Sequence, residues 1–298
     1  MAASPSHDRI EGFRFRRLEK PEEFRQIDEV VRATYGPEAA LGLSPMLERV
    51  LQDNGGLVLG AFADIHLAGF SVGHLGWDGT TLYLNSFVTA VRPEYQNHQL
   101  GFRLKSYQRD EVLKWGLGEI RWVFDPLQSR NAWLAVRRLG GRPDRYYPHY
   151  FGQMPDAINR GLETDRVRVL WPIAAPWVEE RLTRKLPSRE ADQARWAASS
   201  AIVETAPGES GLRVPSSVAE PSGDRAQLEI PFDLASIREH EPGALRPWRH
   251  AVRDAFRAAE DLGYAIDDFA VVSAEHERRS FYLLTRGAVA SSGTAPAP

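Results

Sequence analysis

The sequence predicts an α/β (α+β) fold that is followed by a smaller C-terminal α+β unit. Strand-like and helix-like segments alternate between residues 12 and 172, which is typical of sheets covered by helices. Within that region three strand-like runs follow one another directly and are separated only by turn signals. Such a succession predicts an antiparallel meander.

The first elements begin and end at recognisable residues. Residues 12–20 alternate apolar and basic positions and predict a strand, and a helix follows from Pro21 to Gly36. A second helix begins after Ser44-Pro45 and ends before Gly55. The three consecutive strands are LVLGAFA at 57–63, LAGFSVGHLGW at 67–77 and TLYLNSFVTAV at 81–91.

Residues 93–116 predict a polar loop followed by an amphipathic helix. Leu100, Leu104 and Tyr107 fall on one face at helical spacing. The first N–H groups of a helix lack internal partners and the helix dipole is positive at that end, so an anion such as a pyrophosphate is favoured there. An ordinary helix start is the alternative interpretation, because loose glycine patterns are common by chance.

Residues 122–147 predict a short apolar strand, a helix and a further extended segment. Asp125, Pro126 and Gln128 are interpreted as an N-cap, a first-turn proline and a capping-box partner. We expect this helix to end at Gly140-Gly141.

The rest of the chain divides into less regular and more regular parts. Residues 186–225 are rich in Ser, Glu, Arg, Pro and Gly, which predicts a linker or an irregular excursion. A small α+β unit is expected over 226–286, with a helix between one strand and two further strands. We expect a main domain over 12–185 and disordered ends at 1–11 and 287–298.

Composition excludes several classes of protein. The 298 residues are 43% hydrophobic and 26% charged, as in an ordinary globular protein, and the net charge of −3 argues against a nucleic-acid binder. The absence of cysteine excludes disulfides, thiolate metal sites and a cysteine nucleophile, and we predict no metal site. Neither a signal-peptide core nor a run of roughly 18 apolar residues is found, so we expect no membrane partner and a cytoplasmic location.

The segment 93–116 resembles motif A of the GNAT acyltransferases, whose pattern is Gln/Arg-x-x-Gly-x-Gly/Ala. Gln96 and Gly101 match the first and last positions, whereas Gln99 stands where the first glycine is expected. The resemblance implies a GNAT fold with a mixed, largely antiparallel central sheet flanked by helices. It also implies that backbone amides of this loop bind the pyrophosphate of coenzyme A, to which a glycine permits close approach. The implied cofactor-binding residues are Val88, Ala90, Gln96, Asn97, His98, Gln99, Leu100, Gly101 and Phe102.

A narrower group of GNAT-like proteins is closer in pattern. It carries FDPL-x-SRNA, a Tyr-Gly pair, N-x-G-x-x-x-DR, and WR-x-x-x-R followed by Gly-Tyr. The matching segments are FDPLQSRNA at 124–132, FGQM at 151–154 with Phe151 in place of the tyrosine, NRGLETDR at 159–166, and WRHAVR at 248–253 with Gly263-Tyr264 after it. This likeness spans about residues 13–285. Several members of the group occur beside N-acylamino-acid racemases, and some are thought to acylate amino acids from succinyl-CoA or acetyl-CoA.

The usual GNAT general acid is missing from this chain. In many GNAT proteins the helix after motif A carries Asn-x-x-Ala and, about seven residues on, a tyrosine that protonates the leaving thiolate. The corresponding positions here are Ser129 and Val136. Tyr146, Tyr147 and Tyr150 cluster beyond that helix, and we select Tyr147 as the substitute acid, with aromatic packing as the alternative.

The reaction implied by the resemblance is direct attack of a neutral amine on an acyl-CoA thioester. A backbone N–H near Phe87 and Val88 is the implied donor to the oxyanion. Strand alternation puts Leu82, Leu84, Ser86 and Val88 on one face, and Tyr83, Asn85, Phe87 and Thr89 on the other.

The general base stays open, because the strand at 81–91 lacks the carboxylate that many GNAT proteins keep there. The options are Asp125, His74, Asp78, a water held by Ser86 or Asn85, and no residue at all. The predicted catalytic residues are Ser86, Asp125, Asn131 and Tyr147. Of these, Asn131 would hold the acceptor or the thiol by hydrogen bonds. Helix capping is the alternative role of Asp125 and Asn131, and His74 is alternatively a surface or core-edge residue.

An amino-acid acceptor would need a bidentate arginine for its carboxylate. The candidates are Arg130, Arg145, Arg249 and Arg253, and simple solvation is the alternative for each. Arg249 and Arg253 fall four residues apart on one helix face and could instead pair with acids in their own domain.

The sequence therefore predicts an acyl-CoA-dependent N-acyltransferase. The donor would be acetyl-CoA or succinyl-CoA, and the acceptor a primary amine of a small molecule such as an amino acid. The alternative is a catalytically silent GNAT relative that binds CoA or a metabolite, since the motif glycine, the tyrosine and the strand carboxylate are all missing. A third hypothesis is a protein whose C-terminal unit forms a homodimer and whose acceptor is a larger molecule.

Overall fold

The computed structural model describes residues 9–10, 12–37, 39, 42–154, 156, 158–183, 186, 196, 199–274 and 277–287. Of the ends expected to be disordered, Arg9–Ile10 form strand β1, which pairs with the next strand. Gly287 is also described, and residues 1–8, 11 and 288–298 lie outside the described residues.

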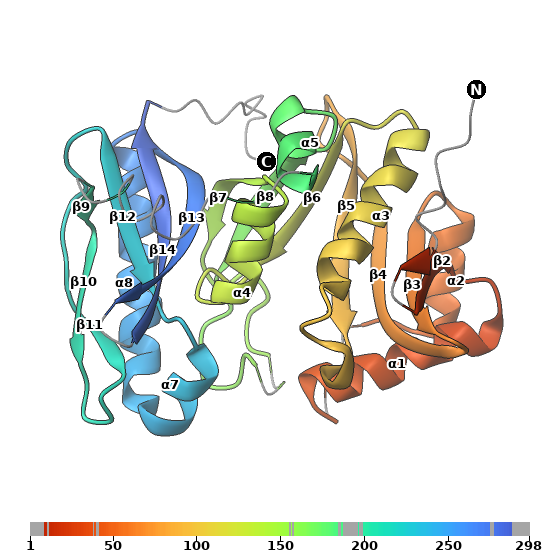
Figure 1. Ribbon diagram of the computed structural model, residues 1–298, viewed down its shortest axis with the longest axis horizontal. Helices are drawn as coiled ribbons and strands as arrows, with labels where there is room; N and C mark the ends of the chain where they lie inside the picture. The colour runs from red at the N-terminus through yellow and green to blue at the C-terminus, as the bar shows by residue number, and fades with distance from the viewer. Residues whose placement is uncertain are drawn as a thin grey trace.

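Three groups of elements follow one another along the chain (Figure 1). The first comprises β1, β2 (Phe13–Arg17), α1 (Pro21–Tyr35), α2 (Pro45–Asp53), β3 (Leu57–Ala63), β4 (His66–Trp77), β5 (Leu82–Val91), the short η1 (Pro93–Tyr95) and α3 (Leu100–Lys114). The second comprises β6 (Glu119–Phe124), α4 (Ser129–Ala132), η2 (Trp133–Arg138), β7 (Arg142–Tyr147), β8 (Arg166–Pro172) and α5 (Pro176–Thr183). The third comprises β9 (Ser200–Ala201), β10 (Val203–Pro207), β11 (Arg213–Val218), β12 (Arg225–Ile230), α7 (Leu234–His240), η3 (Pro242–Ala244), α8 (Leu245–Asp261), β13 (Tyr264–Ala274) and β14 (Glu277–Arg286). Within the described ranges, no helix has the length and apolar character that crossing a membrane requires.

The central sheet has eight strands in the order β1-β2-β3-β4-β5-β6-β8-β7. Its neighbours are antiparallel except for β5 and β6, which are parallel. The expected meander of β3, β4 and β5 is confirmed, and so is the α/β fold class with a mixed, largely antiparallel sheet. β8 inserts between β6 and β7, so β7 is an edge strand.

Helices cover both faces of this sheet. The apolar positions of α1 recur at helical spacing, and Phe24, Ile27 and Val31 pack in one cluster with Phe62 and Phe70 of the sheet. On the other face, Leu100 and Leu104 of α3 pack with residues of β2, β3 and β4. Figure 1 shows α3, α4 and α5 together in front of the sheet.

The helical segment after β6 begins later than the sequence predicted. α4 begins at Ser129, with Gln128 as its N-cap, and continues as the π-helical η2. Asp125 is therefore not a helix N-cap, and that prediction was wrong. The predicted end is confirmed, because Gly140 adopts a left-handed backbone with φ of 73°.

The third group of elements is more regular than expected. Residues 200–218, which fall in the expected linker, contain β9 and the antiparallel hairpin of β10 and β11. β9 pairs with β12 in a sheet of order β13-β14-β12-β9. Trp248 on α8 and Trp171 on β8 belong to one continuous buried cluster, so the core extends from the central sheet into this group. The division at residues 185 and 226 stays a prediction.

Candidate functional site

The parallel strands β5 and β6 pair over only two positions before they separate. The paired residues are Leu84 with Ile120 and Asn85 with Arg121. β5 continues to Val91 beyond that point, and β6 continues to Phe124. The residues that follow directly, Ser86 on β5 and Trp122 on β6, therefore lie where the two strands begin to diverge. The two backbone edges no longer pair with each other beyond this point, and an extended ligand can add to a sheet at such edges.

A β-bulge lies on β5 at this same place. Val72 of β4 pairs with Val88 and the next residue, Gly73, pairs with Ser86, so Phe87 is the additional residue on β5. Phe87 is 43% exposed. The bulge reverses the alternation of side chains, because Val88 packs in the α1 cluster whereas Ser86 contacts α3. The prediction that Ser86 and Val88 share a face was wrong for this reason.

The bulge brings hydroxyl groups from both sides of Phe87 into one buried polar chain under α3. Lys105 donates from Nζ to Ser86 Oγ at 2.6 Å and to Gln108 Oε1 at 3.2 Å. Gln108 donates to Ser71 Oγ at 3.0 Å, and Ser71 shares a hydrogen bond of 2.9 Å with Thr89 Oγ1. Sequence analysis missed Lys105 and Gln108. The available signal was a lysine directly next to Leu104, a core position of the helix.

Lys105 is held in an unusual state for a lysine. Its side chain is buried, and Nζ lies 4.3 Å from the ring centroid of Trp122. Burial lowers the pKa of Lys105 to about 7, because removal from water disfavours the charged form. The neutral amine is therefore well populated near neutral pH.

The loop before α3 contains two non-glycine residues with a left-handed backbone. Asn97 and Gln99 adopt left-handed conformations, with φ of 68° and 57°, and His98 between them is exposed. Gln99 is the N-cap of α3, and its side chain makes no capping hydrogen bond, so it does not use the first N–H groups of the helix. The left-handed φ of Gln99 explains why a glycine suits this position.

Space at the start of α3 is open. A Cβ added to Gly101 would meet only Leu134, at an ordinary 3.8 Å. Leu100 is buried in the core, whereas Phe102 is half-buried under the guanidinium of Arg138, 4.0 Å from its ring centroid. Gly101 thus matches the motif although packing does not require a glycine here.

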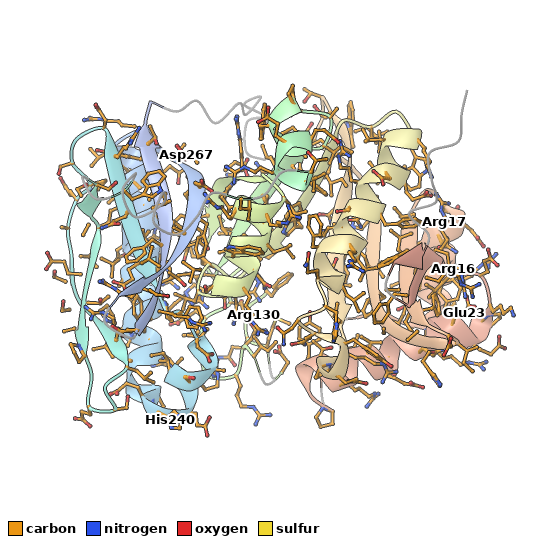
Figure 2. All side chains as sticks on the ribbon, viewed as in Figure 1. Arg16, Arg17, Glu23, Arg130, His240 and Asp267 are labelled. Carbon is orange, nitrogen blue, oxygen red and sulfur yellow. The ribbon has the colours of Figure 1, made fainter. Side chains whose placement is uncertain are left out.

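A cation from α4 faces this loop. Arg130 donates to Asn97 Oδ1 at 3.3 Å and to Gln96 Oε1 at 3.5 Å, and Figure 2 shows it at the start of α4. The Arg130 side chain is exposed and contacts only neutral acceptors through these bonds. The loop amides, the helix dipole and Arg130 together make this end of α3 suited to a phosphate group.

Asp125 has a partner that the sequence did not predict. Its two carboxylate oxygens accept hydrogen bonds from Arg249 NH1 at 2.8 Å and from NH2 at 3.0 Å. Oδ1 also accepts from the backbone N–H of Leu127 at 3.0 Å. A buried carboxylate held this way is engaged in structure and poorly placed to accept a proton from a substrate.

A second ion pair, in which the carboxylate is buried, lies beside the first. Arg253 donates from Nε and NH2 to Asp165, at 2.7 and 2.8 Å, and Tyr146 donates to the same carboxylate at 2.6 Å. Burial opposes ionisation of Asp165, but the bonds from Arg253 and Tyr146 outweigh it and lower its pKa. Arg249 and Arg253 therefore pair with acids of the central sheet region, and the expectation of partners within their own unit was wrong.

Burial, followed by the charge of Asp165, raises the pKa of Tyr146 far above its usual value. Tyr146 is therefore unsuited to donate a proton near neutral pH. Tyr147 is half-buried at the end of β7, with its ring centroid 5.1 Å from that of Tyr150. Asn131 is exposed on α4.

The remaining side-chain candidates for the general base are His74, which lies on β4, and Asp78, which directly follows β4. His74 Nε2 is 2.9 Å from Asn85 Nδ2, and the two residues are paired across β4 and β5. Hydrogen bonds from the backbone N–H groups of Thr81 and Thr80 are the main reason that the pKa of Asp78 lies well below its usual value. A hydrogen bond from Arg121 lowers this pKa further. Asp78 therefore stays ionised and is a weak base.

The four predicted catalytic residues have different contacts. Ser86 belongs to the chain under α3, Asp125 to the ion pair with α8, Asn131 to the exposed part of α4, and Tyr147 to the edge strand β7. The predicted cofactor-binding residues form two groups, Val88 and Ala90 on β5 and the continuous run from Gln96 to Phe102.

Comparison with known proteins gives only distant likenesses. No protein-family model matches the chain, and no curated protein sequence matches it. Among solved structures, the ribosomal-protein-S18-alanine N-acetyltransferase from Escherichia coli has a TM-score of 0.45 and 18% identity, over 55% of this chain and 95% of that one. The aminoglycoside 6'-acetyltransferase type Ii has a TM-score of 0.43 and 19% identity, over 54% and 97%. Because these TM-scores are below 0.5, the fold class depends on the strand order and pairing given above.

Proposed function

We propose that this chain is an acyl-CoA-dependent N-acyltransferase of the GNAT type. The observation that carries the proposal is the separation of β5 and β6 after two residue pairs. The helix that follows β5 in the chain, α3, begins after the loop that is proposed to bind an anion. The pyrophosphate of the donor would bind at residues 96–102, with Arg130 beside it. The thioester would then lie between the diverging strands, next to Ser86 and Val88.

The reaction would proceed by direct transfer. The nitrogen of a neutral primary amine attacks the thioester carbonyl, a C–N bond forms, and the C–S bond breaks with departure of the thiolate. The backbone N–H of Val88, next to the bulged Phe87, is the proposed donor to the oxyanion. Tyr147 and Asn131 stay proposed as the acid and as a hydrogen-bonding residue. The ion pair with Arg249 favours a structural role for Asp125.

For the acceptor, we propose a small primary amine such as an amino acid. Of the four arginines considered for its carboxylate, Arg249 and Arg253 are engaged by Asp125 and Asp165. Arg145, which is exposed at the end of β7 with its guanidinium 5.4 Å from the Tyr147 ring centroid, is then the proposed ligand. An acetyl or a succinyl donor is compatible with this arrangement, and a homodimer stays a proposal that light scattering would test.

The decisive experiment is calorimetric titration with CoA, acetyl-CoA and succinyl-CoA, followed by thiol release in the presence of amino acids. Gly101→Asp adds a carboxylate at the proposed phosphate site where space is open, and should abolish binding. Gly118→Asp is the matched control. A Cβ at Gly118 also meets open space, but this residue lies beyond the C-terminal end of α3, far along the chain from the proposed phosphate site. Binding with thiol release supports the transferase. Binding without release favours the silent relative, and absence of binding by the unmodified protein contradicts both.

A further inference from the structure

Lys105 touches both strands at the point where they separate. Ser86, which accepts its hydrogen bond at 2.6 Å, follows the last β5 residue that pairs with β6. Trp122, whose ring centroid lies 4.3 Å from Nζ, follows the last paired residue of β6. The amine of Lys105 is thus anchored directly beside the opening between β5 and β6.

Among the described residues, the groups that contact this amine or continue its hydrogen-bonded chain are neutral. They comprise Ser71 on β4, Ser86 and Thr89 on β5, Trp122 on β6, and Gln108 on α3 itself. No acid among the described residues forms an ion pair with Lys105, and burial is the cause of its lowered pKa. Buried lysines are normally paired with an acid. A buried charge without an acidic partner costs stability, so burial shifts the equilibrium toward the neutral form, which is well populated near pH 7.

We propose that Lys105 and Ser86 form a proton relay that receives a proton from the ammonium group of the acceptor. The proposal rests on the proposed function. Ser86 bridges the opening and the buried amine: its oxygen accepts from the incoming ammonium, while its hydroxyl proton passes to the lone pair of Lys105. The direction of the hydrogen bond between Lys105 and Ser86 reverses when the amine is neutral, since a neutral amine is an acceptor as well as a donor.

The protons balance over one turnover. The acceptor enters as an ammonium ion and gives one proton through Ser86 to Lys105, which becomes an ammonium ion. The freed amine attacks the thioester, forming the C–N bond and breaking the C–S bond. The amide nitrogen loses a second proton. One of these two protons ends on the departing thiolate to give CoA as a thiol, and the other is released to solvent as Lys105 returns to its neutral form.

The first test needs no substitution in the titrated protein. The chain has four lysines, Lys20, Lys105, Lys114 and Lys185, so a sample labelled with carbon-13 at lysine Cε gives few signals. We expect one signal to titrate near pH 7, in the presence and absence of bound CoA, and to vanish in Lys105→Met. A Lys105 signal that titrates near the ordinary lysine pKa of about 10.4 would overturn the proposal.

The second test separates a proton acceptor from a structural cation. Lys105→Arg keeps a positive charge but cannot become neutral, so it should lose activity as Lys105→Met does, by roughly 100-fold or more in kcat/KM. Both variants, and Ser86→Ala, should also lose the rise of kcat/KM through pH 7. Lys114→Met, at an exposed lysine on the same helix, is the matched control and should keep the profile. Full activity of Lys105→Arg would contradict the relay.

The two proposals fail in distinguishable ways. If the unmodified protein transfers acyl groups and the Lys105 and Ser86 variants keep its rate and pH profile, the relay is wrong and the transferase stands. If the unmodified protein binds no acyl-CoA and transfers nothing to any amine, the proposed function is wrong and the relay falls with it.

Discussion

Arg249 on α8 holds the carboxylate of Asp125 through both of its terminal nitrogens, at 2.8 and 3.0 Å, across 124 residues of sequence. Both side chains are buried, and Arg249 Nε has no hydrogen-bond partner among the described residues. Asp125 directly follows β6, one of the two strands that diverge at the candidate site. The C-terminal helix therefore fixes the end of a strand that borders this site.

Removing one member of that pair should destabilise the fold strongly. Arg249→Met leaves Asp125 buried without its counter-charge and should lower the free energy of unfolding by about 3–5 kcal/mol. The double variant Asp125→Asn, Arg249→Met should recover part of this loss. Urea unfolding at pH 7 measures both. Arg32→Met, which breaks an exposed pair with Asp28, is the control and should cost less than about 1 kcal/mol. Equal effects of the two single variants would contradict the buried pair.

Replacing Gln99 with glycine should strengthen CoA binding. Gln99 adopts a φ of 57°, and a left-handed backbone costs a residue with a side chain roughly 1 kcal/mol more than glycine. Gln99→Gly should therefore raise Tm by a few degrees and also bind CoA more tightly, because the backbone can approach the phosphates more closely. Asp64→Gly, in the turn between β3 and β4 at a φ of 54°, should raise Tm similarly with no change in CoA affinity. Calorimetry and thermal unfolding of both variants test this pair of outcomes.

Arg130 should contribute to donor binding rather than to acceptor binding. Arg130→Ala removes the cation beside Asn97. It should weaken CoA binding by about tenfold, because a charge-assisted bond to phosphate is lost. The CoA affinity of the variant should also depend less on salt concentration than that of the unmodified protein. Arg145→Ala should instead raise KM for an acidic acceptor and leave the Kd for CoA unchanged. A CoA Kd that Arg130→Ala does not alter would remove this residue from the proposed site.

Lys105 should make stability depend on pH in a defined window. Its pKa is about 7 in the folded protein and about 10.4 in the unfolded chain. Between these values the unfolded chain binds more protons, so the free energy of unfolding should rise with pH. Below pH 7 the cost of the buried charge is fully present.

The variant Lys105→Met removes this cost and should gain stability relative to the unmodified protein, on the order of a few kcal/mol at pH 6. That gain should decline steadily toward pH 10. Denaturant unfolding at several pH values measures it, with Lys114→Met as the flat reference. A gain that is constant with pH would show that Lys105 titrates normally.

The sequence predicted the fold well where local signals act alone. The turn residues and alternating runs predicted the meander of β3, β4 and β5, and helical spacing predicted α1 and α3, because these signals act within a few residues. Gly140 likewise marked the end of η2. Such elements depend little on distant partners.

The errors concern residues whose environment is set by distant segments. Asp125 looked like an N-cap because Pro126 and Gln128 follow it, but its partner is on α8. Lys105 looked like one more basic residue of a polar helix, and only the packing of β4, β5 and β6 against α3 shows that it is buried. The lysine directly next to Leu104 is a weak local signal, and it does not show which strands surround the amine.

The additional residue on β5 has a consequence for comparisons between related chains. Before Phe87, the even-numbered Ser86 contacts α3, and after Phe87 it is the odd-numbered Thr89 that reaches that side. A homologue that lacks this residue keeps the surroundings of Val88 and Thr89 when its gap is aligned with Phe87. A gap placed elsewhere would align each of these residues with a neighbour that faces the opposite side. Substitution patterns along this strand would then look contradictory if aligned columns were assumed to share an orientation. Evolutionary inference about this strand therefore has to count residues separately from each end.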